Sequence, residues 1–348
     1  MAENFKIALD AMGGDDSPKK VIDGAALALE KFPTLEYLLV GDQDQIKPLL
    51  DSHPELAKNS EIRHTTEVVL SEDKPAMALR KRKNSSMSLA IKAVADGEAS
   101  CVVSAGNTGA LMAMALFGLK PLPNISRPAI ASYYPTKVAG KRTVLMDLGA
   151  NIQCSAKHLS EFAVLGGTFA QVILKQEQPK IAILNVGSED MKGNDAVQEA
   201  SSLLSEMVLP GEFAGFAEGD DIMSGKFDVV VTDGFTGNIA LKTSEGTASL
   251  MSDMMKKAFS GSLLARLAYP LMIPALNKLK AEMDPRRYNG GVFMGLRGLC
   301  VKSHGGMDEV GFASAIKVGA KMILGDINKH LADALEKNAL LDKGENVA

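Results

Sequence analysis

The sequence has no tryptophan, and aromatic residues occupy only 5% of its 348 positions. Its formal net charge is −4, so basic residues do not outnumber acidic ones. Proteins that bind single-stranded nucleic acid combine a positively charged groove with aromatic side chains on which bases stack. The low aromatic content and the negative net charge therefore argue against a nucleic-acid partner.

Cysteine and long apolar runs are also scarce. The cysteines are Cys101, Cys154 and Cys300, an odd number at wide spacing, which does not fit a disulfide framework. The first residues show no signal-peptide pattern, and no apolar run approaches the roughly 18 residues that a membrane-spanning helix needs. We therefore expect a cytoplasmic protein with reduced thiols.

Several familiar motifs are missing. The sequence contains neither of the nucleotide-binding patterns G-x-x-x-x-G-K-[ST] and G-x-G-x-x-G, and it lacks the G-x-S-x-G nucleophile elbow. His158 and His304 stand alone, and Cys154 lies near no motif that would lower its pKa, so we expect structural roles for all three. No ligand spacing predicts a metal site, and we expect no cofactor, although a divalent cation beside the acidic residues described below stays open.

What the sequence does contain is a repeated pattern, a short apolar run followed by a loop of Gly, Asp, Asn, Ser or Thr. Uninterrupted apolar strands that alternate with helices are typical of a parallel sheet covered on both faces. The pattern therefore predicts a three-layer α/β/α fold with a largely parallel sheet, built as one catalytic domain over 1–348. Ligands bind beyond the carboxyl ends of such strands, so we expect the strand tips to converge on one pocket. The runs are 6–9, 37–40, 101–103, 144–146, 181–184 and 229–231.

The segments between these runs carry the i, i+3, i+4 apolar spacing of helices. Gly166 and Gly167 fall inside one of them, where we expect a break in the helix and close packing against a neighbour. The expected helices are 16–29, 43–53, 86–96, 110–119, 159–175, 194–207 and 238–257, with a partly helical stretch over 68–83 and one or two helices over 310–338.

Two of the loops, 104–109 and 233–238, combine glycine with a following helix. Glycine lets the backbone approach an anion, and a helix N-terminus supplies aligned N–H donors and partial positive charge. Each loop alone fits an ordinary tight turn equally well, but two of them in one sheet favour a phosphate site. The candidate phosphate-binding residues are Ser104, Gly106, Thr108, Gly109, Gly234, Thr236, Gly237 and Asn238.

Aspartates stand at the ends of three of the predicted strands. Such side chains commonly accept hydrogen bonds from the N–H groups of a loop, so we expect them to order the loops instead of contacting phosphate. Their charge would repel an anion unless cations offset it, and Lys192 and Arg127 are candidates for that role. The residues expected to order loops are Asp10, Gly13, Gly14, Asp147 and Asp233.

Two surface features bear on partners. Arg80, Lys81, Arg82 and Lys83 form a concentrated positive patch, which is either a solvated helix end or a docking site for an acidic protein. The apolar stretch 260–285 is interrupted by prolines and flanked by lysines, which predicts a helical hairpin that lies on a membrane or in a dimer interface. Its candidate membrane-contact residues are Leu263, Leu264, Leu267, Leu271 and Ile273.

Four blocks of sequence carry a resemblance to a known family. The blocks 7–15 (IALDAMGGD), 104–110 (SAGNTGA), 147–151 (DLGAN) and 232–238 (TDGFTGN) resemble bacterial phosphate acyltransferases of the PlsX type. Shorter blocks extend the similarity from about residue 5 to about residue 335. The resemblance implies a fold akin to phosphotransacetylases and the isocitrate dehydrogenase group.

The same resemblance implies a reversible reaction, in which a long-chain acyl group passes from the thioester of acyl carrier protein to inorganic phosphate. The acyl phosphate would serve phospholipid synthesis through a downstream glycerol-3-phosphate acyltransferase. It further implies a cytoplasmic homodimer that associates peripherally with the inner face of the membrane, and we expect the carrier protein to dock at the positive patch. The alternatives are a dehydrogenase on a related fold and a non-enzymatic membrane-associated scaffold.

Phosphate is already an anion, so such a reaction needs no activated serine or cysteine. It needs two reactants held together, and donors that stabilise the oxyanion as the thioester carbonyl becomes tetrahedral. We expect Asn107, Asn151 or Asn185 to supply a donor and Lys192 to supply positive charge.

Overall fold

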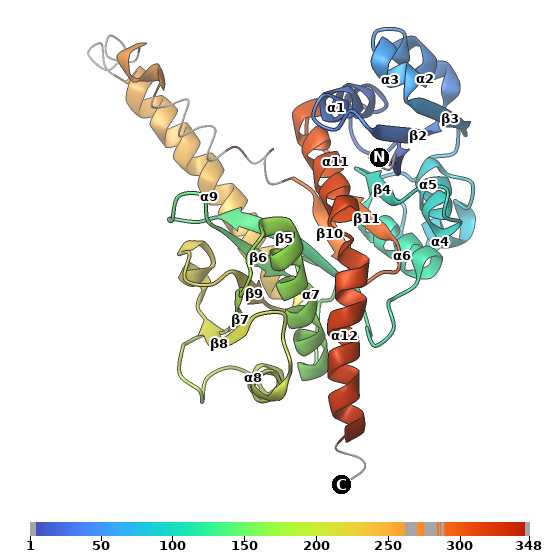
Figure 1. Ribbon diagram of the computed structural model, residues 1–348. Helices are drawn as coiled ribbons and strands as arrows, with labels where there is room; N and C mark the ends of the chain where they lie inside the picture. Colours follow the sequence, from blue (N-terminus) through green and yellow to red (C-terminus); the bar gives the residue numbers. More distant parts are fainter. Residues whose placement is uncertain (1–4, 262–269, 275–283, 285, 287–288, 345–348) are drawn as a thin grey trace.

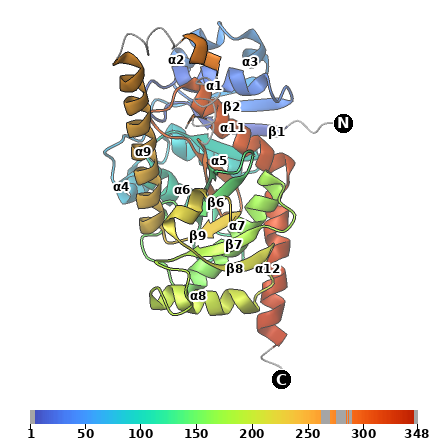
Figure 2. The same cartoon turned by 90° about the vertical axis from the view of Figure 1, so that its left-hand side faces the viewer.

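The computed structural model describes residues 5–261, 270–274, 284, 286 and 289–344, with side chains as far as residue 338. These residues form one sheet with helices on both of its faces (Figures 1 and 2), which confirms the predicted three-layer α/β architecture. The strands are β1 (Phe5–Asp10), β2 (Leu35–Gly41), β3 (Ser60–His64), β4 (Cys101–Ser104), β5 (Ala129–Pro135), β6 (Arg142–Met146), β7 (Lys180–Leu184), β8 (Glu212–Ala217), β9 (Val229–Val231), β10 (Gly291–Met294) and β11 (Leu299–Lys302).

All six apolar runs are strands, namely β1, β2, β4, β6, β7 and β9. The interior strand β9, for example, has all three valines fully buried, as a strand covered on both faces requires. The strands that the pattern missed include β3 and β8 at the two edges of the sheet. Edge strands carry polar and half-exposed residues, so they lack the uninterrupted apolar run on which the prediction depended.

The strands run in two opposing sets. The 11-stranded sheet has the order β3-β2-β1-β4-β11-β10-β5-β6-β9-β7-β8. β3, β2, β1, β4 and β11 are mutually parallel, and so are β6, β9, β7 and β8. Between the two sets, β10 pairs antiparallel with both β11 and β5, and β5 pairs antiparallel with β6. The three antiparallel pairings reverse the direction, so the second parallel set runs opposite to the first.

Helices cover the sheet in two groups, each above its own buried apolar cluster. One face carries α1 (Lys19–Leu29), α2 (Gln43–Leu50), α3 (Pro54–Lys58), α7 (Ala156–Leu174), α8 (Asp195–Glu206), α11 (Glu309–Leu324) and α12 (Ile327–Gly344). The other face carries α4 (Pro75–Lys81), α5 (Ser86–Ala95), α6 (Thr108–Leu119), a short 3₁₀ helix (Gly219–Met223) and α9 (Gly234–Ser260).

The glycine pair in α7 lies within one continuous helix, so the expected break is wrong. The expected close packing is confirmed, because a Cβ added at Gly166 would lie 2.7 Å from Val229 Cγ1, and one at Gly167 would lie 2.8 Å from the carbonyl oxygen of Pro210. Tertiary packing thus keeps the helix intact where intrinsic propensity alone would weaken it.

The long helix α9 begins earlier than predicted, at Gly234 instead of Asn238. Asp233 caps it by accepting a hydrogen bond from Thr236 N, so most of the predicted loop 233–238 is the first turn of a helix. Figure 1 shows α9 leaving the body of the molecule toward its C-terminal end. Within the described ranges, no helix is both long and apolar enough to cross a membrane.

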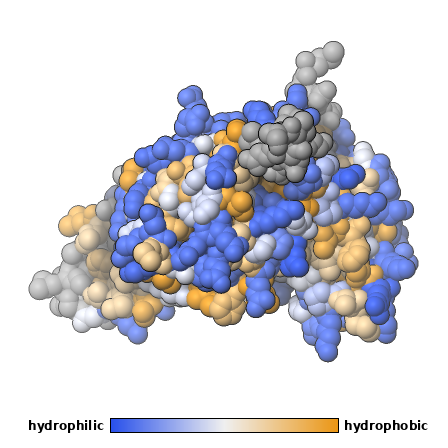
Figure 3. All heavy atoms as spheres, turned by 90° about the horizontal axis from the view of Figure 1, so that it is seen from below, coloured by the Kyte–Doolittle hydropathy of each residue, from blue (hydrophilic) through white to orange (hydrophobic). Residues whose placement is uncertain are grey.

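Most of the predicted hairpin 260–285 lies outside the described residues, including Leu263, Leu264 and Leu267. Residues 270–274 are helical, and Leu271 is 86% exposed. Figure 3 shows apolar and polar side chains interspersed over the face of the molecule seen from below. An exposed leucine is ordinary on such a surface, so Leu271 alone does not identify a contact site.

Candidate active site

Polar residues gather at two places in the sheet, which we call the first and the second cluster. The first cluster lies at the carboxyl ends of β1, β4 and β11 and comprises Asp10, Lys20, Ser86, the loop 104–109, Lys302 and His304. The second cluster lies at the carboxyl ends of β6, β7 and β9 and comprises the loop 147–151, Cys154, Asn185, Lys192 and the residues 233–238.

Asp10 is the buried centre of the first cluster. Its carboxylate accepts hydrogen bonds of 2.6 Å from the hydroxyls of both Ser86 and Ser104, while Ser104 Oγ accepts one from the backbone N–H of Gly106. Burial raises the pKa of Asp10, against the lowering effect of these hydroxyls. The Ser104 hydroxyl and the Gly106 N–H are both engaged inside the protein, so neither is available to a ligand.

Asn107 heads helix α6 and fastens a second segment to it. Its Oδ1 accepts a hydrogen bond from Ala110 N, and its Nδ2 donates to the carbonyl oxygens of Ser71 at 2.9 Å and Asp73 at 3.1 Å. The backbone N–H groups of Thr108 and Gly109 have no acceptor among the described residues. Two donors at the N-terminus of a 12-residue helix are therefore available to an anion, while the Asn107 amide itself is occupied.

Two lysines of the first cluster were not predicted from the sequence. Lys20 is only 6% exposed and donates from Nζ to the carbonyl oxygen of Gly305, while Lys302 donates from Nζ to the carbonyl oxygens of Ala105 and Ser303. Burial lowers the pKa of Lys302 to about 8. The short apolar run of β11, followed by Lys302, Ser303 and two glycines, is the same pattern that marked the other strands and could have identified the site.

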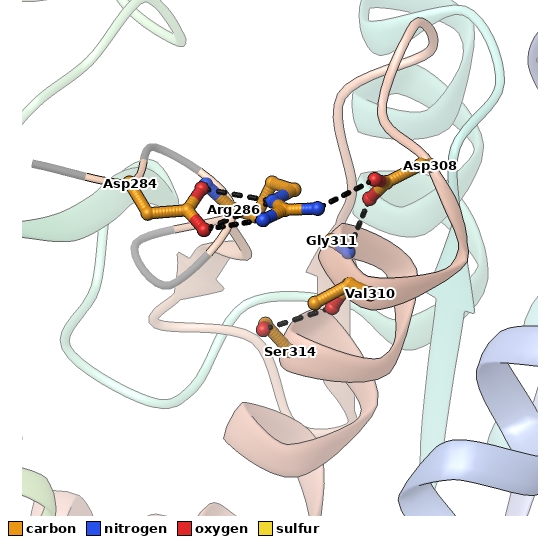
Figure 4. A network of polar contacts seen from close by, with 6 residues as sticks. All are labelled: Asp284, Arg286, Asp308, Val310, Gly311 and Ser314. Carbon is orange, nitrogen blue, oxygen red and sulfur yellow. Dashed lines mark hydrogen bonds and ion pairs between the residues drawn. The ribbon is translucent and has the colours of Figure 1, made fainter. Parts of the chain in front are cut away.

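The loop that follows Lys302 is fastened at its far end. Arg286 donates to both carboxylate oxygens of Asp284 and, at 2.9 Å, to Asp308 (Figure 4). Asp308 in turn accepts from Gly311 N and caps α11. His304, within this loop, has its pKa lowered by burial first and by Lys242 of α9 next. The loop is therefore held between α11, Arg286 and the face that α9 passes.

Asp147 is the centre of the second cluster, and it is fully buried. Its carboxylate accepts hydrogen bonds from the backbone N–H groups of Ile130, Gly149, Ala150 and Asn151. The side chain of Asn151 donates to Asp147 and to the carbonyl oxygen of Pro128. These are the contacts of residues that order a loop, and both N–H bonds of the Asn151 amide are engaged.

The residues 233–238 do not offer a cradle for phosphate, contrary to our expectation. Asp233 accepts from Thr236 N at 2.8 Å and from its hydroxyl at 2.9 Å, and Gly234 N donates to the carbonyl oxygen of Asn151. A Cβ at Gly237 would lie 1.9 Å from the carbonyl oxygen of Asp147. Gly234 N thus docks α9 onto the loop 147–151, Thr236 N and Gly237 N are bound to Asp233, and the Asp233 carboxylate would repel an anion.

Asn185 and Lys192 belong to one exposed loop beside the second cluster. Asn185 Nδ2 donates to the carbonyl oxygen of Lys192 at 2.9 Å, and Lys192 Nζ lies 3.0 Å from Glu189.

A pocket of about 550 Å³ adjoins this loop and is lined by Ile152, Gln153, Cys154, Asn194, Asp233, Phe235 and Thr236. Burial raises the pKa of Cys154 to about 12, so this thiol is no nucleophile at neutral pH.

The two clusters do not converge on one pocket within the chain, and that prediction is wrong. The two parallel sets run in opposite directions, so the carboxyl end of β4 and that of β9 point to opposite sides of the sheet along the strand axis. Three strands also separate β4 from β6, which at about 4.8 Å per strand is roughly 19 Å. α9 connects the two places, because it starts at Asp233 and carries Lys242 and Glu245 close enough to His304 to change its pKa.

The positive patch is exposed at the C-terminal end of α4. Arg82 pairs with Asp73 at 3.1 Å, whereas Arg80, Lys81 and Lys83 extend into solvent.

Among the residues that the structure describes, no group of three or more His, Cys, Asp or Glu side chains is placed to hold a metal ion. The acidic residues of both clusters are instead engaged with hydroxyl and N–H donors.

Comparisons with known proteins agree on one class of enzyme. A family model described as "Fatty acid synthesis protein" matches residues 5–330. A protein named phosphate acyltransferase from Rhodospirillum centenum is 54% identical over 337 residues, which cover 97% of this chain and 94% of that protein. A protein of the same name from Rhodospirillum rubrum is 48% identical over 348 residues, covering 100% of this chain and 99% of its own.

Solved structures show the same fold at low sequence identity. A phosphotransacetylase from Streptococcus pyogenes aligns with a TM-score of 0.61 at 19% identity, over 93% of this chain and 95% of that one. The EutD phosphotransacetylase from Staphylococcus aureus aligns with a TM-score of 0.58 at 18% identity, over 91% and 94%. The expected likeness to phosphotransacetylases is thereby confirmed at the level of the fold.

Proposed function

The chain belongs to the fatty acid synthesis protein family, and from this premise we propose that it transfers a long-chain acyl group from acyl carrier protein to inorganic phosphate, reversibly. The near full-length match to proteins named phosphate acyltransferase supports acyl transfer to phosphate in lipid synthesis. A phosphate oxygen attacks the thioester carbonyl, the new C–O bond forms, and the C–S bond breaks as the carrier thiolate leaves. The thiolate then takes a proton from water.

The first cluster is where we place phosphate and the reacting carbonyl. The single observation that carries this assignment is the pair of unoccupied N–H groups of Thr108 and Gly109 at the start of α6. Such donors stabilise a phosphate, and a neighbouring N–H can stabilise the oxyanion of the tetrahedral intermediate. Asn107 then acts as a positioning residue, because its own amide holds the loop in place.

Asn151, Asn185, Lys192 and Asn238 belong to the second cluster, which β10 and β5 separate from the strands of the first in the sheet order. They stabilise the oxyanion only if the thioester reacts there instead. The turnover of Lys192→Ala and Thr108→Pro decides between the two places, since Thr108→Pro removes one N–H donor at the first helical position, where proline is tolerated. Removal of an oxyanion donor typically costs about 100- to 1000-fold in turnover.

We place the acyl carrier protein at the exposed residues Arg80, Lys81 and Lys83, because their neighbour Arg82 pairs with Asp73, which is bonded in turn to Asn107 at the start of α6. Carrier proteins that are acidic would be steered to such a patch.

We further propose a homodimer that lies peripherally on the inner face of the membrane through the segment 260–285. It would pass its product to a glycerol-3-phosphate acyltransferase. The lysines that flank this apolar segment in the sequence, Lys256, Lys257, Lys278 and Lys280, support the membrane contact, since they suit an anionic surface.

The deciding experiment follows free thiol released from a long-chain acyl carrier protein, with and without phosphate. The proposed function predicts thiol release only when phosphate is present, with acyl phosphate as the product. Acyl phosphate added to the carrier thiol should give the reverse reaction. Release without phosphate would indicate a thioesterase, and a change at the absorbance band of reduced nicotinamide would indicate a dehydrogenase.

A further inference from the structure

Lys20 is buried and Lys302 is half-buried, and neither ammonium group has an ion-pair partner among the described residues. Lys20 lies on α1, and Lys302 ends β11, yet both ammonium groups reach the same small region between the loops 13–16, 104–109 and 303–306. No carboxylate oxygen of a described residue lies within 4.0 Å of either Nζ. Buried charges are ordinarily paired, because desolvation of a lone ion is costly.

Hydrogen bonds within the protein use only some of the N–H donors of these two ammonium groups. Lys20 spends one N–H bond on the carbonyl of Gly305, and Lys302 spends two on the carbonyls of Ala105 and Ser303. An ammonium group has three donors, so both lysines keep donor capacity that carbonyl oxygens do not use. The nearest buried carboxylate, Asp10, is already engaged by two serine hydroxyls.

The geometry brings these cations next to the helix N-terminus of the first cluster. Lys302 Nζ lies 3.3 Å from the carbonyl oxygen of Ala105, which is three residues before Thr108. A Cβ added at Gly14 would lie 3.1 Å from Lys20 Nζ and 3.0 Å from the carbonyl oxygen of Ala105. The backbone at Gly14 has φ +85°, so glycine is needed there both for the conformation and for the approach of the lysine.

We propose that Lys20 and Lys302 are phosphate-binding residues, which hold inorganic phosphate together with the N–H groups of Thr108 and Gly109. A phosphate dianion would pair directly with both ammonium groups and would accept their remaining N–H bonds. The half-exposed edges of the loops, at Gly14, Asn107 and Gly305, leave the site open to a small anion. The inference rests on the proposed function and replaces Lys192 as the main source of positive charge.

The test compares Lys20→Met and Lys302→Met with Lys19→Met. Lys19 is the matched control, because it adjoins Lys20 in sequence but is exposed and pairs with Asp23 on the surface. Inorganic phosphate should raise the thermal unfolding temperature of the wild type and of Lys19→Met but not of the two buried-lysine variants. The KM for phosphate should rise roughly 10- to 100-fold in those variants, while the KM for the acyl carrier protein stays within about twofold.

A variant that fails to fold is replaced by a comparison of Lys302→Arg, which keeps the charge, with Lys302→Gln, which removes it. Retained phosphate stabilisation in both buried-lysine variants would overturn the inference, and so would a rise confined to the KM for the carrier protein, which would assign the lysines to the phosphate of its prosthetic arm. If the wild type binds phosphate but releases no thiol, the proposed function fails and the binding site stands.

Discussion

The side-chain nitrogen of Asn107 lies 2.9 Å from the carbonyl oxygen of Ser71, so the residue that caps α6 also fixes the segment before α4. The first cluster and the positive patch are therefore joined by one amide. Changes at Asn107 should act on stability as well as on turnover.

Asn107→Ala should lower the free energy of unfolding by about 2 kcal/mol, because it removes a helix cap and the bonds to the segment 70–73. Asn194→Ala is the control, since Asn194 caps α8 through Val197 N alone, and it should cost about 1 kcal/mol. Urea unfolding measures both. Equal losses in the two variants would show that the bonds to Ser71 and Asp73 contribute nothing.

Gly237→Ala should destabilise the protein by at least about 3 kcal/mol, because the added Cβ would lie 1.9 Å from the carbonyl oxygen of Asp147 and neither backbone can move freely. Gly246→Ala, in the same helix, meets nothing within 4 Å and should stabilise it by about 1 kcal/mol. Thermal unfolding of the two variants gives the comparison. A normal unfolding temperature for Gly237→Ala would mean that α9 is not docked on the loop 147–151.

The stability contributed by Lys302 should depend on pH with a definite sign. Burial lowers its pKa to about 8 from the usual 10.5, so between these values the unfolded chain holds a proton that the folded chain has lost. Stability then rises with pH across this window, by at most about 3 kcal/mol. Lys302→Met should lack this rise when unfolding is followed from pH 7.5 to 10. Parallel curves for wild type and variant would contradict the lowered pKa.

Reversal of two charges in the positive patch should weaken binding of the carrier protein selectively. Lys81→Glu with Lys83→Glu leaves the Arg82–Asp73 pair intact and should raise the KM for acyl carrier protein about tenfold at low salt, with less effect as salt increases. The KM for phosphate should not change. Lys329→Glu with Lys337→Glu on α12 is the control with the same change in charge. An equal effect on the KM for acyl carrier protein there would mean that the carrier protein does not dock at the positive patch.

Leu271→Glu should release the protein from anionic lipid vesicles, because a charge at an 86% exposed apolar position opposes insertion into the interface. Leu324→Glu, at an exposed leucine of α11, should leave vesicle binding unchanged. Cosedimentation measures the bound fraction. Persistent vesicle binding together with loss of the dimer would favour the interface interpretation of the segment.

The apolar runs predicted the six strands because complete burial on both faces leaves an unbroken signature in the sequence. Their relative direction has no such signature. It depends on β5 and β10, which enter the sheet antiparallel, and neither carries a motif. The expectation of one converging pocket failed for this reason alone.

The two glycine loops are equivalent in sequence. They differ in the hydrogen bonds that their backbone N–H groups make in the folded protein. Thr108 N and Gly109 N remain available, whereas Gly234 N and Thr236 N are consumed by Asn151 and Asp233. The hydrogen bonds of Asp147 are local in sequence and follow from the preference of Asp for loop N–H groups. Lys20 and Lys302 were missed because 282 residues separate two side chains that meet only after folding.

The two ion pairs of Arg286 couple the positions of Asp284 and Asp308. Its guanidinium holds Asp284 on one side and Asp308 on the other, and Asp308 closes the loop that carries His304. Any displacement of Asp284 must either stretch these charged bonds or drag Asp308 with it. Tension along the polypeptide from the segment 260–285 would thus be transmitted to the first cluster through the side chain of Arg286.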